Sequence, residues 1–388
     1  MSHYLDYAAT TPVRAEAVEA MLPILTENFG NPSGAHLLAR AANQVVDESR
    51  ERLAGALGCQ PGEIVFTAGG TEADNLAITG AVEGRGGRPA GLAVCSAIEH
   101  HAVLDPVEHL GGAVVAVGAD GRIDLEDLRR TLTSQAGSGG TVAVVSVMLA
   151  NNEVGAIQPI SEVAAITREL APGALVHTDA VQALCWLDVA SLTAEADLVS
   201  ISGHKFGAPK GVGALVVRER AEAGSKLVPL IKGGGQERGR RGGTHNVAGI
   251  AALAVAAELT VAERAEQVER VTKLRDRLAD GIAASVDGAI ETGDRRTKTA
   301  NICHFCFEGI ESEALLFLLE RADIMASAAS SCSSGAMEPS HVLTAMGFDR
   351  AMAFGSLRLS LGYASTDDDV DAVLAAIGPA VERLRERG

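Results

Sequence analysis

The chain has 388 residues, 47% of them hydrophobic and 21% charged, and its 33 basic and 50 acidic residues give a formal net charge of −17. This is the composition of a globular protein that is long enough for more than one domain. The acidic balance argues against nucleic acid as a direct ligand, because phosphate binding needs a basic face.

The six cysteines, at positions 59, 95, 185, 303, 306 and 332, do not have the spacing of a disulfide framework. The first residues show no basic region followed by an apolar run, and no apolar stretch reaches the roughly 18 residues of a membrane span. We therefore expect a cytoplasmic protein in a reducing compartment, with no membrane partner.

Short β-branched runs alternate with helical patterns from about residue 60 to residue 220. This alternation predicts an α/β domain with a mostly parallel sheet, whose ligands bind at the carboxyl ends of the strands. The expected strands are residues 63–67, 92–96, 113–117, 142–148, 174–177, 198–201 and 212–217, with helices such as 71–82 and 160–170 between them.

A long helical pattern over residues 247–286 looks like a bridge into a second domain. Beyond it we expect a strand at 301–307, a helix at 311–321, a segment around Cys332, a strand at 356–361 and an amphipathic helix at 367–387.

Ser202-Gly203-His204-Lys205 places a lysine between a small-residue turn and a Gly/Pro loop, and Asp179 lies 26 residues upstream. Such a lysine can act as an imine-forming nucleophile. The carboxylate can keep the ring nitrogen of pyridoxal phosphate (PLP) charged, which makes the ring an electron sink. For any single lysine, a solvated surface position is the competing interpretation.

Two further segments follow predicted strands. Gly69-Gly70-Thr71 opens a helix, where backbone N–H groups and the helix dipole favour a phosphate, although many Gly-Gly pairs are only turns. Glu99-His100-His101 can supply an imidazole that stacks on the cofactor ring and exchanges protons, or can simply start a helix.

Three other segments each allow two interpretations. An amide of Asn151-Asn152 can donate to the phenolic oxygen of the ring, or the pair can form a turn. The loop 233–244 is rich in glycine and arginine, and can cradle an anion or serve as a flexible linker. Arg358 lies in an apolar strand, where its partner is a substrate carboxylate or a structural ion pair.

Cys332 lies among small polar residues, which indicates an accessible loop whose thiolate can attack sulfur rather than a buried hydrophobe. Cys303 and Cys306 match C-x-x-C, but in a strand they point to opposite faces, so we expect core packing and no metal site.

Together, and over nearly its whole length, the chain resembles the cysteine desulfurases, PLP enzymes of the aminotransferase fold. Its Cys332 segment is similar to the subgroup that carries the catalytic cysteine on a longer loop. The segments that carry the resemblance are Tyr4-Leu5-Asp6-Tyr7-Ala8-Ala9-Thr10-Thr11-Pro12, Gly30-Asn31-Pro32-Ser33, residues 66–72, Glu99-His100, residues 151–155, Asp179-x-x-Gln182, Ser202-Gly203-His204-Lys205, residues 234–238 and Cys332.

The resemblance implies a homodimer of the fold type I PLP-dependent transferases (aspartate-aminotransferase-like). It implies a large PLP domain, residues 15–258, with a mostly parallel seven-stranded sheet, and a smaller α+β domain made of residues 1–14 and 259–388. At the cofactor ring it implies Lys205 as the Schiff-base lysine, Asp179 as the partner of the ring nitrogen, His100 as the stacking residue, and Asn152 and Gln182 at the ring oxygen. At the phosphate it implies Gly70, Thr71, Ser202 and His204, with Thr244 reaching across the dimer. At the substrate it implies Asn152 and Arg358.

The implied activity converts L-cysteine to L-alanine and transfers the sulfur to Cys332 as a persulfide, then to an acceptor or scaffold protein. That sulfur can feed iron–sulfur assembly, tRNA thiolation or DNA phosphorothioation. The sequence departs from the family pattern at Ala328-Ala329, at Gly242-Gly243 and at Ala208, none of which is a reacting group. The alternatives are a selenocysteine lyase or aminotransferase of the same fold, and a non-catalytic sulfur-acceptor scaffold.

Overall fold

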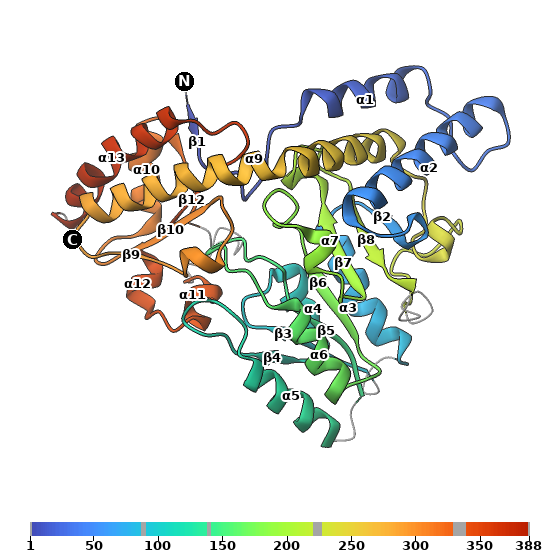
Figure 1. Ribbon diagram of the computed structural model, residues 1–388, viewed down its shortest axis with the longest axis horizontal. Helices are drawn as coiled ribbons and strands as arrows, with labels where there is room; N and C mark the ends of the chain where they lie inside the picture. Colours follow the sequence, from blue (N-terminus) through green and yellow to red (C-terminus); the bar gives the residue numbers. More distant parts are fainter. Residues whose placement is uncertain (1, 87–90, 138–140, 220–226, 329–338, 387–388) are drawn as a thin grey trace.

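The computed structural model describes residues 2–86, 91–137, 141–219, 227–328 and 339–386. Its largest element is a seven-stranded sheet of order β2-β8-β7-β6-β5-β3-β4, in which only β8 runs antiparallel to its neighbours (Figure 1). The strands are β2 (Ile64–Thr67), β3 (Gly91–Ser96), β4 (Ala113–Val115), β5 (Thr141–Ser146), β6 (Leu175–Asp179), β7 (Leu198–Ser202) and β8 (Gly213–Val217).

Helices cover both faces of this sheet, and alternate strand residues face the two layers. In β8, for example, Ala214 and Val216 face the core under α2, α5, α6 and α9, whereas Leu215 and Val217 face α3 and α4. The helices of this part are α1 (Ala15–Thr26), α2 (Leu37–Leu57), α3 (Gly70–Gly84), α4 (His101–His109), α5 (Leu125–Gly137), α6 (Ile160–Leu170), α7 (Val189–Leu192) and α9 (Val247–Ser285).

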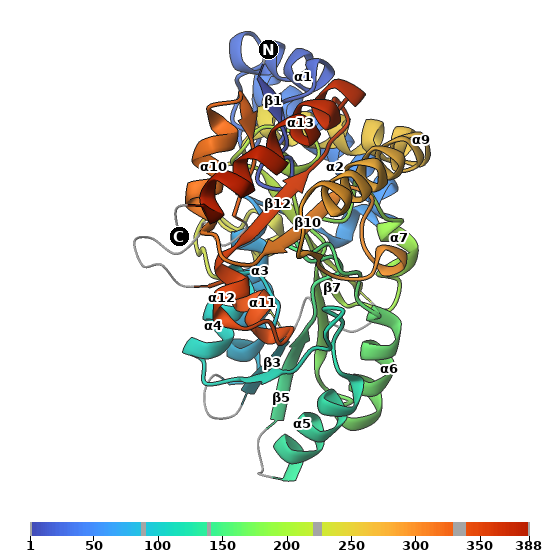
Figure 2. The same cartoon turned by 90° about the vertical axis from the view of Figure 1, so that its left-hand side faces the viewer.

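The helix α9 runs from the large sheet into a smaller lobe with its own apolar core, as Figures 1 and 2 show. There an antiparallel sheet of order β12-β10-β9 packs with α10 and α13, and the N-terminal strand β1 pairs in parallel with β11. The elements of this lobe are β1 (His3–Tyr4), β9 (Ala289–Glu291), β10 (Ile302–Phe307), β11 (Ile324–Met325), β12 (Ser356–Ser360), α10 (Ser312–Glu320), α11 (His341–Ala345), α12 (Arg350–Phe354) and α13 (Asp367–Arg385).

The predicted α/β architecture with a mostly parallel seven-stranded sheet is confirmed, and every expected strand is present with shifted ends. The shift that matters most is in β6, which was expected to stop at residue 177 but continues to Asp179, so this carboxylate stands on the last residue of a central strand. Cys303 and Cys306 are both buried in β10 and belong to different apolar clusters, as opposite faces require. Within the described ranges, the helices are too short or too polar to cross a bilayer.

Candidate functional site

A cavity of about 790 Å³ opens where the carboxyl ends of the central strands meet the N-terminal segment and β12. Ten of the twelve site residues predicted from the sequence line it, although they come from distant parts of the chain. Thr244 is exposed on its loop outside this lining, and Cys332 lies outside the described residues. The ten are Gly70, Thr71, His100, Asn152, Asp179, Gln182, Ser202, His204, Lys205 and Arg358.

One end of the cavity is built for an anion. The turn after β2 leads into the 15-residue helix α3, whose N-cap, Gly69, has φ 153 and contributes no capping side chain. A Cβ added at Gly70 would lie 2.7 Å from Cγ2 of Val181, so only glycine fits there without displacing that side chain. The first residues of α3, whose N–H groups have no acceptor within the helix, line the cavity beside Ser202, which is the kind of position where a phosphate binds.

Asp179 forms the acidic part of the cavity. Its side chain is buried, and Oδ1 accepts a hydrogen bond of 2.8 Å from the backbone N–H of Val181. Burial raises the pKa of the Asp179 carboxyl, while the nearby His100 and Lys205 act in the opposite direction. A buried carboxyl with these neighbours is suited to hold a cationic ring nitrogen.

His100 follows β3 and is the N-cap of α4, so it does start a helix, while its position in the cavity lining leaves the predicted contact with the cofactor ring open. Its Nδ1 accepts a hydrogen bond of 3.0 Å from the N–H of Ala102, while the ring lines the cavity. Burial lowers the pKa of His100, which favours the neutral ring. Because Nδ1 is an acceptor, the neutral ring carries its hydrogen on Nε2.

Lys205 closes the short 3-10 turn Gly203–Lys205 after β7. Its Nζ donates to the carbonyl oxygens of Ala8 (2.6 Å) and Ala9 (2.9 Å). The side-chain amide of Gln182 also donates to the Ala8 carbonyl, at 2.8 Å. The N-terminal segment thus holds two of the groups predicted to contact the cofactor.

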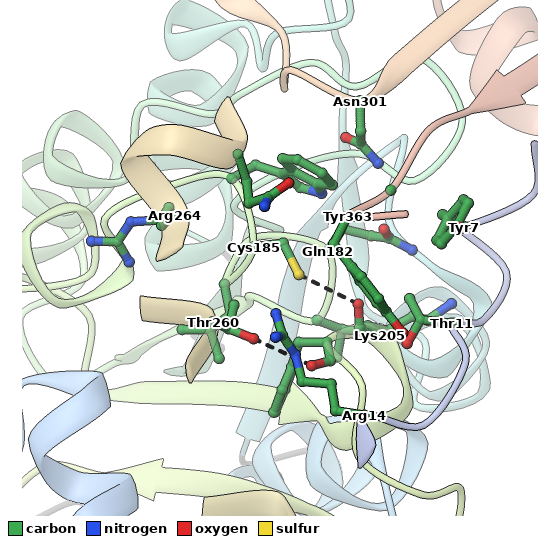
Figure 3. Close-up of a pocket in the computed structure, with 16 residues that line it drawn as sticks. Tyr7, Thr11, Arg14, Gln182, Cys185, Lys205, Thr260, Arg264, Asn301 and Tyr363 are labelled. Atoms are coloured by element: carbon green, nitrogen blue, oxygen red, sulfur yellow. Dashed lines mark hydrogen bonds between the residues drawn. The ribbon is translucent and has the colours of Figure 1, made fainter. Parts of the chain in front are cut away.

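A second, smaller pocket lies behind Lys205 and is shown in Figure 3. It is lined by aromatic and apolar groups such as Tyr7 and Tyr363, and the Sγ of Cys185 donates to the Lys205 carbonyl at 3.5 Å. Its volume of about 20 Å³ holds no more than one water. The larger cavity on the other side of the lysine is therefore the candidate active site.

Arg358 reaches the cavity from β12 and is 96% buried, at 4% exposed. Its Nη2 donates to Oδ1 of Asp6 at 2.7 Å, and Nη1 donates to the Asn152 carbonyl at 2.9 Å. Among the described residues, its buried Nε has no hydrogen-bond partner. The structural ion pair is thus present, and the guanidinium keeps N–H groups that these two contacts do not use.

The two asparagines have different positions. Asn151 builds the turn, because its Oδ1 accepts from the N–H groups of Glu153 and Val154 while Nδ2 donates to the Ile98 carbonyl. Asn152 lines the cavity. The predicted turn is therefore confirmed at Asn151, and contact of Asn152 with the ring oxygen stays a prediction.

The loop 233–244 is tied to the large domain. Glu237 is buried and accepts hydrogen bonds from Arg50 (2.6 and 2.9 Å), His245 (2.6 Å) and the N–H of Phe66 (3.0 Å). Arg241 pairs with Glu72 at 2.9 Å. These contacts argue against a free linker, and they fix the loop that carries Thr244.

Sequence reasoning did not assign three acidic residues of the cavity to the site, Asp6, Glu72 and Asp74. Asp74 lies four residues after Gly70, one turn along α3, so it faces the same side of the helix. That spacing was the available signal. Among the described residues, no cluster of three or more His, Cys, Asp or Glu side chains is arranged to hold a metal ion.

Comparison with known proteins places this geometry in context. The sequence profile of the family "Aminotransferase class-V" matches residues 3–373. The chain is 45% identical to a cysteine desulfurase of Gluconacetobacter diazotrophicus, covering 99% of this chain and 94% of the relative. It is 44% identical to the IscS-like cysteine desulfurase of Mycobacterium tuberculosis, covering 98% and 97%.

Solved structures agree with the fold. A NifS-like protein superposes with a TM-score of 0.86 at 35% identity, covering 100% of this chain and 99% of the other. DndA from Streptomyces lividans gives 0.75 at 38% identity, covering 92% and 99%. The family uses PLP, and the anion-binding turn, the buried Asp179 and Lys205 fit that cofactor in one cavity.

Proposed function

This chain belongs to the aminotransferase class-V family of PLP-dependent enzymes, and we propose that it is a cysteine desulfurase that converts L-cysteine to L-alanine. The observation that carries the proposal is the gathering of ten predicted residues, Lys205 among them, in one cavity. Relatives named cysteine desulfurase, 40–45% identical over nearly the whole chain, support it.

The residues of the cavity divide the work of holding the cofactor. The N-terminus of α3, with Gly70 and Thr71, would bind the phosphate together with Ser202 and His204. Asp179 would hold the charged ring nitrogen, Asn152 and Gln182 would contact the ring oxygen, and Lys205 would bind the cofactor covalently. When bound, PLP supplies an electron sink for bond breaking at the amino acid.

The protein's own groups then handle substrate and protons. Arg358 would bind the substrate carboxylate through N–H groups that its contacts with Asp6 and Asn152 do not use, beside the cavity surface of Asn152. Lys205, once released as a free amine, would take the Cα proton. His100 is our candidate for proton handling on the substrate thiol. In the neutral ring its Nε2–H would donate a hydrogen bond, and Nε2 would release a proton only after Nδ1 is protonated at the expense of the cap of α4.

Cys332 is our candidate for the sulfur-accepting nucleophile. Its thiolate would attack the sulfur of cysteine, so that an S–S bond forms while the Cβ–S bond breaks, and the carbon skeleton leaves as alanine after protonation. The described residues on either side of its segment support this: Ser327 lines the cavity, and Nε2 of His341 lies 2.9 Å from the carbonyl oxygen of Glu99, next to His100. The persulfide would then pass to an acceptor protein.

We also propose a homodimer. Large apolar side chains are exposed along α1 and on the segment that leads into α2, and such a patch marks an interaction surface. Thr244 is exposed and outside its own cavity, which suits a residue that reaches the phosphate of the partner subunit. The exposed side chains are Val18 (42%), Leu22 (54%), Leu25 (59%), Phe29 (69%) and Leu37 (73%).

The division into two domains and the cellular compartment belong to the same proposal. Leu5 packs in the apolar core of the smaller lobe, which supports a large domain of residues 15–258 and a small domain of 1–14 and 259–388. The described cysteines are free thiols, which suits a reducing cytoplasm.

The test is an assay of sulfide and alanine from L-cysteine with a thiol reductant and no keto acid. We expect both products in equal amounts, and Cys332→Ala should keep the visible absorption of the bound cofactor while losing both. Cys59→Ala, a half-buried cysteine outside the cavity, is the control. A requirement for a keto acid would indicate an aminotransferase, activity on L-selenocysteine alone a lyase, and a colourless, inactive protein a scaffold.

A further inference from the structure

A row of polar side chains crosses the large sheet below the cavity. His177 of β6 lies in its middle, with Nδ1 2.8 Å from the hydroxyl of Ser146 on β5 and Nε2 3.0 Å from the hydroxyl of Ser200 on β7. All three side chains have no exposed surface. Central strands of such a sheet are normally apolar on both faces, so this row must satisfy its hydrogen bonds internally.

A buried carboxyl stands at each end of the row. Asp74 of α3, 1% exposed, has Oδ1 3.6 Å from Nε2 of His177 and interacts with Ser200. Glu99, fully buried, accepts from the Ser96 hydroxyl (2.7 Å) and the Met148 N–H (2.8 Å). Oδ1 of Asp74 and Oε2 of Glu99 have no hydrogen-bond partner within the part of the chain that the structure describes.

The charges around these carboxyls are unequal. Asp179 lies near the cation of Lys205 and the titratable ring of His100, and both act to lower its pKa. Among the described residues, the charged groups that act on Asp74 are the carboxyls of Asp179 and Glu99. The ring of His177 offers no cation, because burial lowers its pKa to about 3.

Burial together with neighbouring carboxyls disfavours a second and third negative charge in this volume. Burial raises the pKa of Asp74 well above its usual range, and it raises the pKa of Glu99 to about 8. A protonated acid at Asp74 also gains a donor, which can satisfy an acceptor in the row.

We propose that Asp74 is a positioning residue that remains a neutral acid at the end of the Ser200–His177–Ser146 row, so that Asp179 is the charged carboxylate that faces the ring nitrogen of PLP. Asp74 lies beside His177 of the row and influences Asp179 electrostatically, without touching the reacting atoms. The proposal rests on the role of Asp179 in the proposed function.

The first test is infrared spectroscopy of the PLP-loaded enzyme at neutral pH, which separates the C=O stretch of protonated acids from the bands of carboxylates. Asp74→Asn should remove one protonated-acid component, while that of Glu99 remains. Asp105→Asn, a control whose side chain is 66% exposed, should remove a carboxylate band only. Loss of a carboxylate band in Asp74→Asn would overturn the proposal.

The second test is a pH titration of the visible cofactor band. Asparagine mimics the neutral acid, so the titration midpoint of Asp74→Asn should stay within half a pH unit of the wild-type midpoint. If Asp74 were charged, its replacement would remove that charge and move the midpoint by about one pH unit or more. If Asp74→Asn does not fold, Ser200→Ala should shift the protonated-acid band in frequency, and an unshifted band would overturn the proposal. Neither readout depends on turnover of cysteine, so each can succeed or fail independently of the desulfurase activity.

Discussion

On the floor of the cavity, buried polar side chains bond to one another across the strands, as Ser146, His177 and Ser200 do. At its rim, Lys205, Gln182 and Arg358 bond instead to the N-terminal segment, residues 6–9. Floor contacts can persist when a ligand arrives, because they do not point into the volume that the ligand needs. Rim contacts involve the groups that must bind the ligand, so they have to be exchanged or shared.

This difference separates two tasks of an active site. A preorganised floor fixes where charge sits before the reaction, and little reorganisation is needed at the moment of chemistry. At the rim, carbonyl oxygens and one carboxylate accept hydrogen bonds from the cations Lys205 and Arg358 before the substrate binds. Substitutions of single residues test whether the two regions differ in this way.

The largest effect is expected at Lys205, the rim group with the most chemistry assigned to it. Lys205→Ala should abolish the visible band of the lysine-bound cofactor and lower kcat by about 10³-fold or more, as loss of a covalent anchor and proton acceptor requires. Absorbance measures the cofactor band, and the rate of alanine release measures kcat. Lys210→Ala, which removes another lysine of the cavity lining, is the matched control and should keep the band. Wild-type turnover in Lys205→Ala would contradict the assignment.

Glu237 is a buried carboxyl like those of the floor, but it has a cationic partner, Arg50. Hydrogen bonds from His245 and Arg50 outweigh its burial and lower its pKa to about 2 from the usual 4.5. The folded state therefore binds this proton less readily than the unfolded state. The resulting stability is fully present above about pH 4.5 and is lost as the pH falls toward 2.

Glu237→Gln should accordingly lower the free energy of unfolding by about 3 kcal/mol at pH 7, with the difference from wild type shrinking toward pH 2. Urea denaturation over this pH range gives the measurement. Glu258→Gln, which removes an ion pair to Arg52 with both side chains 42% exposed, should cost no more than about 1 kcal/mol. A pH-independent loss in Glu237→Gln would mean that the carboxylate's charge is not what stabilises the loop.

The sequence predicted the parts of this site that local patterns encode. The Gly-Gly-Thr turn, His100 and Lys205 each follow a strand, and the carboxyl ends of parallel strands meet at one edge of a sheet. Asp74 was missed because an acidic residue in a helix is normally exposed to solvent. Its burial follows from the packing of α3 on the sheet.

Arg358, near the other end of the chain, also shows how little local sequence patterns say about distant partners. Its position in an apolar strand predicted a buried cation that needs a partner. The partner, Asp6, lies 352 residues away and meets it only because the N-terminal segment runs along β12. The two interpretations of loop 233–244 stayed open for a similar reason, since its anchors Arg50 and Phe66 are distant in sequence.

The smallest predicted effect tests whether a rim contact competes with substrate. Asp6→Asn keeps an acceptor of the same shape beside Arg358 but removes the negative charge that a substrate carboxylate would face. We expect KM for L-cysteine to fall about fivefold, equivalent to about 1 kcal/mol, with kcat little changed, because the buried guanidinium gains most from the incoming carboxylate.

Steady-state kinetics with L-cysteine measure this split between KM and kcat. Glu263→Gln is the control, since it removes the charge that pairs with Arg14 at 2.9 Å, and neither its pair nor Glu263 itself belongs to the cavity lining. It should leave KM unchanged. A rise in KM for Asp6→Asn at constant kcat would mean that Asp6 orients Arg358 for the substrate. In that case the Asp6–Arg358 contact would persist when the substrate binds, as the floor contacts do. Only the rim contacts of Lys205 and Gln182 would then be exchanged for contacts with the ligand.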